Sequence, residues 1–202
     1  PFEQPEPRVR VDAWMLERLL DGASVRLNSS KMGIRFTAEI GATYDADATY
    51  HVLIVPYEYI TLLGITGDYY TQLREKLGEN AYIATMEALP FQATAEDAEQ
   101  HGLTQGLYYV RGSLTTIQYD NMNTKFFGIA YSVKDGVYTY ASFNEGENVR
   151  SLVEISSRAL NGAYKNNETL QGFVNRGLNN ALGNADSTTY NGEIKLSNAE
   201  LN

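Results

Sequence analysis

The side chains of this chain that could do chemistry include two histidines, many carboxylates and 15 tyrosines, with no cysteine among them. Asp45 and Asp47 stand two residues apart in the segment YDADATY, a spacing used by oxygen ligands in Ca²⁺ loops. The glycine and the closing glutamate of an EF-hand are missing from this segment. Two interpretations stay open, a Ca²⁺ site at Asp45 and Asp47 or a solvated acidic turn, and we predict no other cofactor.

Catalytic signatures are missing from the sequence. It contains no G-x-S-x-G, H-E-x-x-H, P-loop, G-x-G-x-x-G or S-x-x-K motif, and any histidine-based site must use His51 or His101. We expect both histidines to be structural. A glycan hydrolase needs two carboxylates roughly 5 to 9 Å apart in a cleft. Acidic residues are plentiful, but the sequence selects no pair from among Glu39, Asp45, Asp47, Glu58, Asp68 and Glu87.

Tyrosine is the most informative residue type, with 15 copies against seven phenylalanines and one tryptophan. A plain core would favour Phe, whereas Tyr combines an apolar ring with a polar tip and suits wet surfaces. We predict a binding surface in the loops around residues 57–70 and 108–119, where aromatic rings could stack on a sugar or contact a partner domain. Its six residues are Tyr57, Tyr59, Tyr69, Tyr70, Tyr108 and Tyr109. The alternative is that these tyrosines only close the edge of a sheet.

Charge and hydropathy exclude two classes of partner. The net charge is −9 and no cluster of Lys and Arg interrupts it, so we predict no nucleic-acid binding. No apolar stretch approaches the roughly 20 residues that cross a bilayer, so we predict no membrane insertion. The absence of cysteine excludes disulfides and thiolate metal sites.

The elements that must position these side chains are mainly strands. Period-2 alternation predicts a strand over 33–40, which forms a hairpin with 22–30, and Arg26 and Arg35 are expected to stabilise this sheet. Further strands are predicted over 49–60 (ending or lying at an edge because of Pro56), 107–117, 124–133 and 136–143. Asp135 and Gly136 predict a tight turn between the last two. A short helix is expected over 12–22, a helical turn over 70–77, and a long loop with up to one helical turn over 81–105.

The hydrophobic period then changes from two to about 3.6 residues, which predicts amphipathic helices over 147–160 and 168–183. Strands grouped first and helices last indicate an α+β fold, an antiparallel β-sandwich-like sheet core with two C-terminal amphipathic helices. We expect a Pro-rich linker over 1–11, a single β-rich domain over 12–183 and a polar tail or linker over 184–202.

Residues 22–162 carry, in this order, the segments ASVR, GIRF, GSL and RSLVE. This order resembles a β-rich module of unestablished activity found in large secreted or surface-attached multidomain proteins of Gram-positive anaerobes. The resemblance implies an extracellular or cell-surface setting, a non-catalytic role in binding or adhesion, and no particular functional residue. From the residues and the resemblance together we expect a module that binds a glycan or a neighbouring protein domain, with a carboxylate-pair glycan hydrolase and a purely structural spacer as alternatives.

Overall fold

A computed structural model of the chain describes residues 10–11, 33–115, 117, 121, 123–143, 148–161, 166, 168 and 171–172. For 10–11 and 157–161 only the backbone is described. The described part is mixed and strand-rich, and both of its sheets are antiparallel, as predicted. The expected helix over 12–22, the first arm of the hairpin with Arg26, most of the second C-terminal helix and the tail lie outside the described residues.

The first sheet has the strand order β1-β2-β6-β5. Its strands are β1 (Arg10–Val11), β2 (Gly33–Gly41), β5 (Phe91–Gln92) and β6 (Tyr108–Thr115). In the register of β2 against β6, Arg35 stands opposite Ser113, and its Nε donates a hydrogen bond to the Ser113 hydroxyl at 3.0 Å. This contact ties the two central strands together, which supports the predicted structural role of Arg35.

The second sheet contains five strands, with the order β4-β3-β7-β8 and β9 beside β7. Its strands are β3 (Thr49–Pro56), β4 (Ala84–Glu87), β7 (Lys125–Lys134), β8 (Val137–Tyr140) and β9 (Val149–Ser151). β7 and β8 are joined by the predicted turn, in which Asp135 and Gly136 both have positive φ, 50° and 76°.

The two sheets approach closely because glycines replace side chains at two contact points. A Cβ built on Gly128 of β7 would lie 2.3 Å from ring atoms of Phe36 on β2. One built on Gly112 of β6 would lie 2.6 Å from the Cβ of Val52 on β3. A continuous apolar core runs between the sheets, and these buried residues include Ile34, Phe36, Ala38, Val52, Ile54 and Val110.

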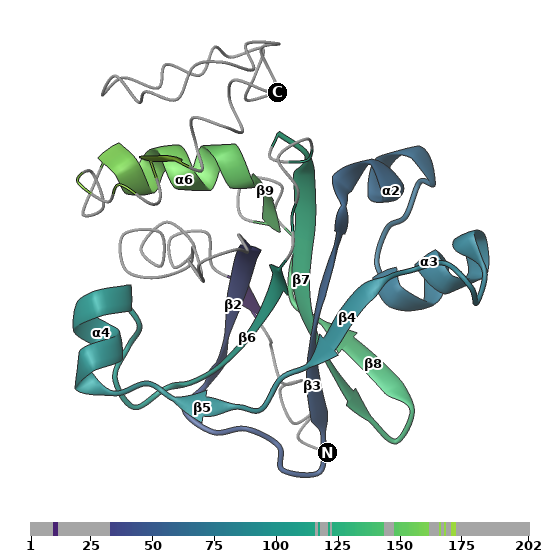
Figure 1. The fold of residues 1–202 in the computed structure, drawn as a ribbon. Coiled ribbons are helices and arrows are strands. Elements are labelled where there is room, and N and C mark those ends of the chain that lie inside the picture. The colour runs from purple at the N-terminus through teal and green to yellow at the C-terminus, as the bar shows by residue number, and fades with distance from the viewer. Residues whose placement is uncertain are drawn as a thin grey trace.

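Helices cover the other face of the five-stranded sheet over part of its length (Figure 1). α2 (Tyr57–Leu62) and α3 (Tyr69–Leu77) lie on the side away from β2 and β6. Phe127 packs against the Tyr69 ring on this side, at 4.9 Å between centroids. α4 (Ala95–His101) follows β5, and α6 (Leu152–Asn161) follows β9. The apolar run of β3 is therefore buried on both faces.

Two predicted element boundaries were wrong, and a third prediction was confirmed in part. Residues 81–105, predicted as a long loop with up to one helical turn, contain the strands β4 and β5 as well as the helix α4. Residues 149–151, predicted as helix, form β9, and the helix begins only at Leu152. The strand predicted over 49–60 ends at Pro56, which is one of the two effects predicted for this proline, and α2 starts at the next residue. The other predicted effect, a place at the edge of the sheet, was wrong, because β3 lies between β4 and β7. In each case pairing with a distant strand, or the conformation that Pro56 imposes, outweighs the local pattern.

Candidate functional site

The six predicted tyrosines lie on three different elements. Tyr57 and Tyr59 are on α2, Tyr69 and Tyr70 on α3, and Tyr108 and Tyr109 on β6 of the other sheet. The segment over 57–70 is thus partly helical and not a loop.

Two of these tyrosines contribute to packing. Tyr109 is fully buried, and its hydroxyl accepts a hydrogen bond from the backbone N–H of Thr104 at 2.9 Å. Tyr69 is also buried, at 8% exposure, against Phe127. Their rings therefore contribute little to the surface.

The remaining predicted tyrosines divide between separate neighbourhoods. Tyr57 contacts the ring of Phe143 at 6.5 Å, as does the buried Tyr69 at 6.4 Å. Tyr108 contacts Tyr44 at 4.9 Å. The structure does not gather the six tyrosines into one surface. Tyr70 joins the larger aromatic group described next, and the buried Tyr69 contacts Tyr140 of that group at 5.4 Å.

A row of four side chains crosses the five-stranded sheet on the face that carries α3. The strand register places Glu87 of β4 beside His51 of β3, His51 beside Tyr131 of β7, and Tyr131 beside Tyr140 of β8. Because side chains of directly opposed residues project from the same face of a sheet, the four form one continuous line. Apart from His51, which we expected to be structural, and Glu87, one of the acids considered for a hydrolase, these residues were not among the predicted site residues.

Rings from α3 and the β8 hairpin complete this group around Tyr131. The His51 ring lies 4.9 Å from the Tyr131 ring at an interplanar angle of 10°. Tyr70 and Tyr138 lie 6.1 and 5.8 Å from Tyr131, with angles of 14° and 27°, and 6.1 Å from each other. The three phenol rings therefore form a compact group of similarly oriented planes. We call His51, Tyr70, Glu87, Tyr131, Tyr138 and Tyr140 the outer-face cluster.

Hydrogen bonds fix three rings of the outer-face cluster, those of Tyr70, Tyr131 and Tyr140. The hydroxyls of Tyr131 and Thr85 are 2.6 Å apart, and the Tyr140 hydroxyl accepts from the backbone N–H of Tyr70 at 3.0 Å. Arg74 donates from Nε to the Tyr70 hydroxyl at 3.3 Å and lies over its ring at 5.5 Å. Such contacts reduce the side-chain entropy that binding would otherwise have to remove.

The outer-face cluster has a buried ring at its centre and exposed side chains at its edge. Tyr131 is only 2% exposed and Tyr138 is 38% exposed, while His51, Tyr70 and Tyr140 are intermediate and Glu87 is exposed. Burial raises the pKa of Tyr131 to about 12 and also raises the pKa of Tyr140. Burial lowers the pKa of His51, although Glu87 opposes this shift. At neutral pH the phenols of Tyr131 and Tyr140 therefore keep their protons, and the imidazole of His51 is predominantly uncharged.

The predicted acidic turn forms an ion pair with a lysine of the protein. The Asp45 carboxylate is 2.6 Å from Nζ of Lys134, and it also accepts the backbone N–H of Asp47 at 2.9 Å. The hydrogen bond from Lys134 and the backbone bond hold the Asp45 pKa below its usual value. In the part of the chain that the structure describes, no three His, Asp or Glu side chains come together as a metal site. A Ca²⁺ ion at Asp45 and Asp47 would have to compete with Lys134.

Comparisons with known proteins assign no family. No protein-family model matches the chain, and no curated protein shows significant sequence similarity to it. Among the helices that the structure describes, none has the length and hydropathy of a membrane span. Any functional conclusion must therefore come from the geometry of the chain itself.

Chemically, the outer-face cluster offers aromatic surface together with hydroxyl, imidazole and carboxylate groups. The sequence alternation is consistent with these residues sharing a sheet face, but the spacing within any one segment does not predict that they meet. His51, Glu87, Tyr131 and Tyr140 alternate with inward-facing residues on their own strands, but the strand register is needed to place them side by side.

Proposed function

We propose that this chain is a non-catalytic binding module of an extracellular bacterial multidomain protein and that it binds a glycan through the outer-face cluster. The two sheets would form a β-sandwich on which two C-terminal helices pack, α6 being the first. The observation that carries the proposal is the group of similarly oriented rings of Tyr70, Tyr131 and Tyr138 on one sheet face.

A sugar ring has an apolar face of C–H groups and an edge of hydroxyls. Tyrosine suits both parts, since its ring offers apolar contact and its hydroxyl offers a hydrogen bond. The exposed ring of Tyr138 would receive the C–H face, while the Glu87 carboxylate would accept hydrogen bonds from sugar hydroxyls. Because hydrogen bonds already hold the rings of Tyr70, Tyr131 and Tyr140, little ordering of these three rings is required on binding.

A glycan array with the purified 202-residue chain tests this proposal, followed by calorimetry on any glycan that binds. We expect Tyr138→Ala to weaken binding about tenfold, which corresponds to roughly 1.4 kcal/mol, because it removes the most exposed ring of the cluster. Tyr44→Ala is the matched control, since Tyr44 is similarly exposed at 42% but contacts Tyr50 and Tyr108 instead. A folded chain that binds no glycan, or equal affinities in the wild type and Tyr138→Ala, would reject the proposal.

A further inference from the structure

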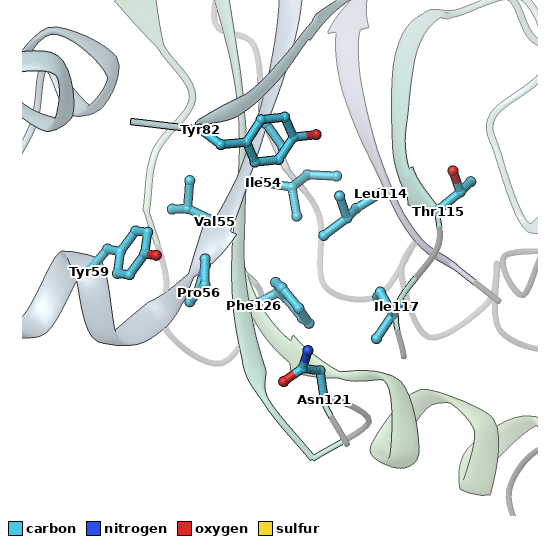
Figure 2. Close-up of a pocket in the computed structure, with 11 residues that line it drawn as sticks. Ile54, Val55, Pro56, Tyr59, Tyr82, Leu114, Thr115, Ile117, Asn121 and Phe126 are labelled. Carbon is cyan, nitrogen blue, oxygen red and sulfur yellow. The ribbon is translucent and has the colours of Figure 1, made fainter. Parts of the chain in front are cut away.

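A pocket of about 370 Å³ opens at the end of the sheets where β3 and β6 end and β7 begins. Figure 2 shows Ile54, Leu114, Ile117 and Phe126 around its centre. These residues come from both sheets and from the segment after β6, so the pocket is an outward opening of the core. It is separate from the outer-face cluster, with which it shares no residue.

Among the described residues, the lining of the pocket contains no charged residue, although the chain as a whole has a net charge of −9. An ionised group placed against such apolar walls would lose its hydration without gaining a partner charge. The ligand that fits best is therefore uncharged.

Of the described lining residues, four carry a polar side-chain group, namely Tyr59, Tyr82, Thr115 and Asn121. In the view of Figure 2, the Tyr82 ring and the Asn121 amide border it at opposite ends, and Tyr59 flanks it from α2. Tyr82 is 83% exposed and Tyr59 is 39% exposed, so both rings are accessible to a ligand. Asn121 offers both donor and acceptor atoms. A sugar would leave most of its hydroxyls without partners against these walls, whereas an apolar ring with one polar atom would not.

The volume limits the size of the ligand. A dry apolar cavity of about 150 Å³ binds one benzene ring, and ligand pockets in general begin at about 300 Å³. The volume of about 370 Å³ in a pocket that opens to solvent is thus larger than a single ring requires and fits two fused rings.

We propose that this pocket binds an uncharged two-ring aromatic group that carries one hydrogen-bonding atom. The rings lie between Leu114, Ile54 and Phe126, and the polar atom meets the Asn121 amide. The ligand is either a free small molecule or the indole of a tryptophan on another protein chain, since both present the same chemistry. This site is independent of the glycan site proposed above.

The test is a titration followed by the methyl NMR signals of Ile54, Val55 and Leu114. The probes are 2-naphthol for a free molecule, N-acetyl-tryptophanamide for a protein side chain, and 2-naphthoate as the anionic analogue of the first. We expect saturable shifts with 2-naphthol in the millimolar range or tighter and at least tenfold weaker binding of 2-naphthoate. Tighter binding of 2-naphthol than of N-acetyl-tryptophanamide would identify a free molecule as the source, and the reverse order would identify a protein side chain. No shift with either uncharged probe, or equal binding of the anion, overturns the proposal.

Two variants place the binding in the pocket. Ala84→Leu adds bulk to the lining, and Tyr82→Ala removes an exposed ring from its border, so we expect each to weaken 2-naphthol binding at least fivefold. Leu89→Ala is the matched control, because Leu89 is an equally exposed apolar residue outside the lining. Tyr82→Ala keeps the test decisive if Ala84→Leu fails to fold. Unchanged affinity in folded Tyr82→Ala and Ala84→Leu overturns the assignment.

Discussion

The imidazole of His51 lies flat against the phenol ring of Tyr131, with 4.9 Å between the ring centroids and 10° between the planes. Thr49 adds a contact of 2.9 Å between its hydroxyl and Nε2 of His51. The stack partly buries the imidazole, and this burial lowers the His51 pKa. A proton on His51 is therefore less favourable in the folded chain than in the unfolded chain.

The stability of the protein should accordingly fall as the pH drops below the usual histidine value of about 6.5, because the unfolded chain then takes up the proton first. Above that pH the contribution is fully present. We expect a smaller loss of unfolding free energy between about pH 7.5 and pH 5.5 in His51→Asn than in the wild type, measured by urea denaturation. His101→Asn is measured in parallel, since burial also lowers the His101 pKa. Identical pH slopes in the wild type and His51→Asn would contradict this expectation.

Gly128→Ala should destabilise the chain by about 1 to 3 kcal/mol, because the new methyl group would overlap the Phe36 ring of the opposite sheet. Chemical denaturation measures this loss. The double variant Phe36→Leu/Gly128→Ala should lose less than the sum of the two single losses, since the smaller side chain leaves room for the methyl group. Additive losses would show that the contact does not limit the distance between the sheets.

Asn148→Leu should cost about 1 to 3 kcal/mol of stability, because it leaves a buried carbonyl without its partner. The side-chain amide of Asn148 donates to the carbonyl oxygen of Gly128 at 2.8 Å. Gly128 lies in β7 between the residues that pair with β8 and those that pair with β9. The Asn148 amide therefore donates to a carbonyl that would otherwise accept from a neighbouring strand. Asn148→Asp offers a second test, as its carboxylate cannot donate the bond. Stability equal to the wild type in both variants would argue against this role.

Thr94→Ala should destabilise α4 by about 1 kcal/mol. The Thr94 hydroxyl accepts from the backbone N–H of Asp97 at 3.2 Å, and the Asp97 carboxylate accepts from the backbone N–H of Thr94 at 2.8 Å, which completes a capping box. Hydrogen exchange of the α4 amides measures the change, and Thr94→Ser, which keeps the hydroxyl, should exchange at the wild-type rate. Equal exchange in Thr94→Ala would mean that tertiary contacts hold α4.

The sequence was sufficient to predict those strands and turns that have a clear local residue pattern. Alternation predicted β2, and the Asp135-Gly136 pair predicted the β7–β8 turn. β4 and β5 were missed because neither has a strong local pattern, and each depends on pairing with a longer strand. β9 was taken for helix because its residues continue the apolar spacing of α6, whereas pairing with β7 decides its conformation.

The candidate site was less predictable than the fold. The excess of tyrosine led to the prediction of an aromatic binding surface, but composition does not tell which rings meet. Tyr70, from the predicted set, meets Tyr131 and Tyr138 only because α3 packs over β7 and β8. Tyr109, predicted to lie on the surface, is buried beside Leu103 and Ala93, which belong to the segment mistaken for a loop. Both outcomes depend on contacts between segments far apart in the chain.

The pairing pattern of the two sheets has a consequence for synthesis on the ribosome. β2 (Gly33–Gly41) pairs with β6 (Tyr108–Thr115), and β3 (Thr49–Pro56) pairs with β7 (Lys125–Lys134). A nascent chain that ends before residue 108 therefore contains β2 and β3 without their main partner strands. Until those partners are made, we expect the apolar residues of β2 and β3 to stay unburied. Non-local pairing of this kind also slows folding. We expect the growing polypeptide to need protection from aggregation until β7 has left the exit tunnel.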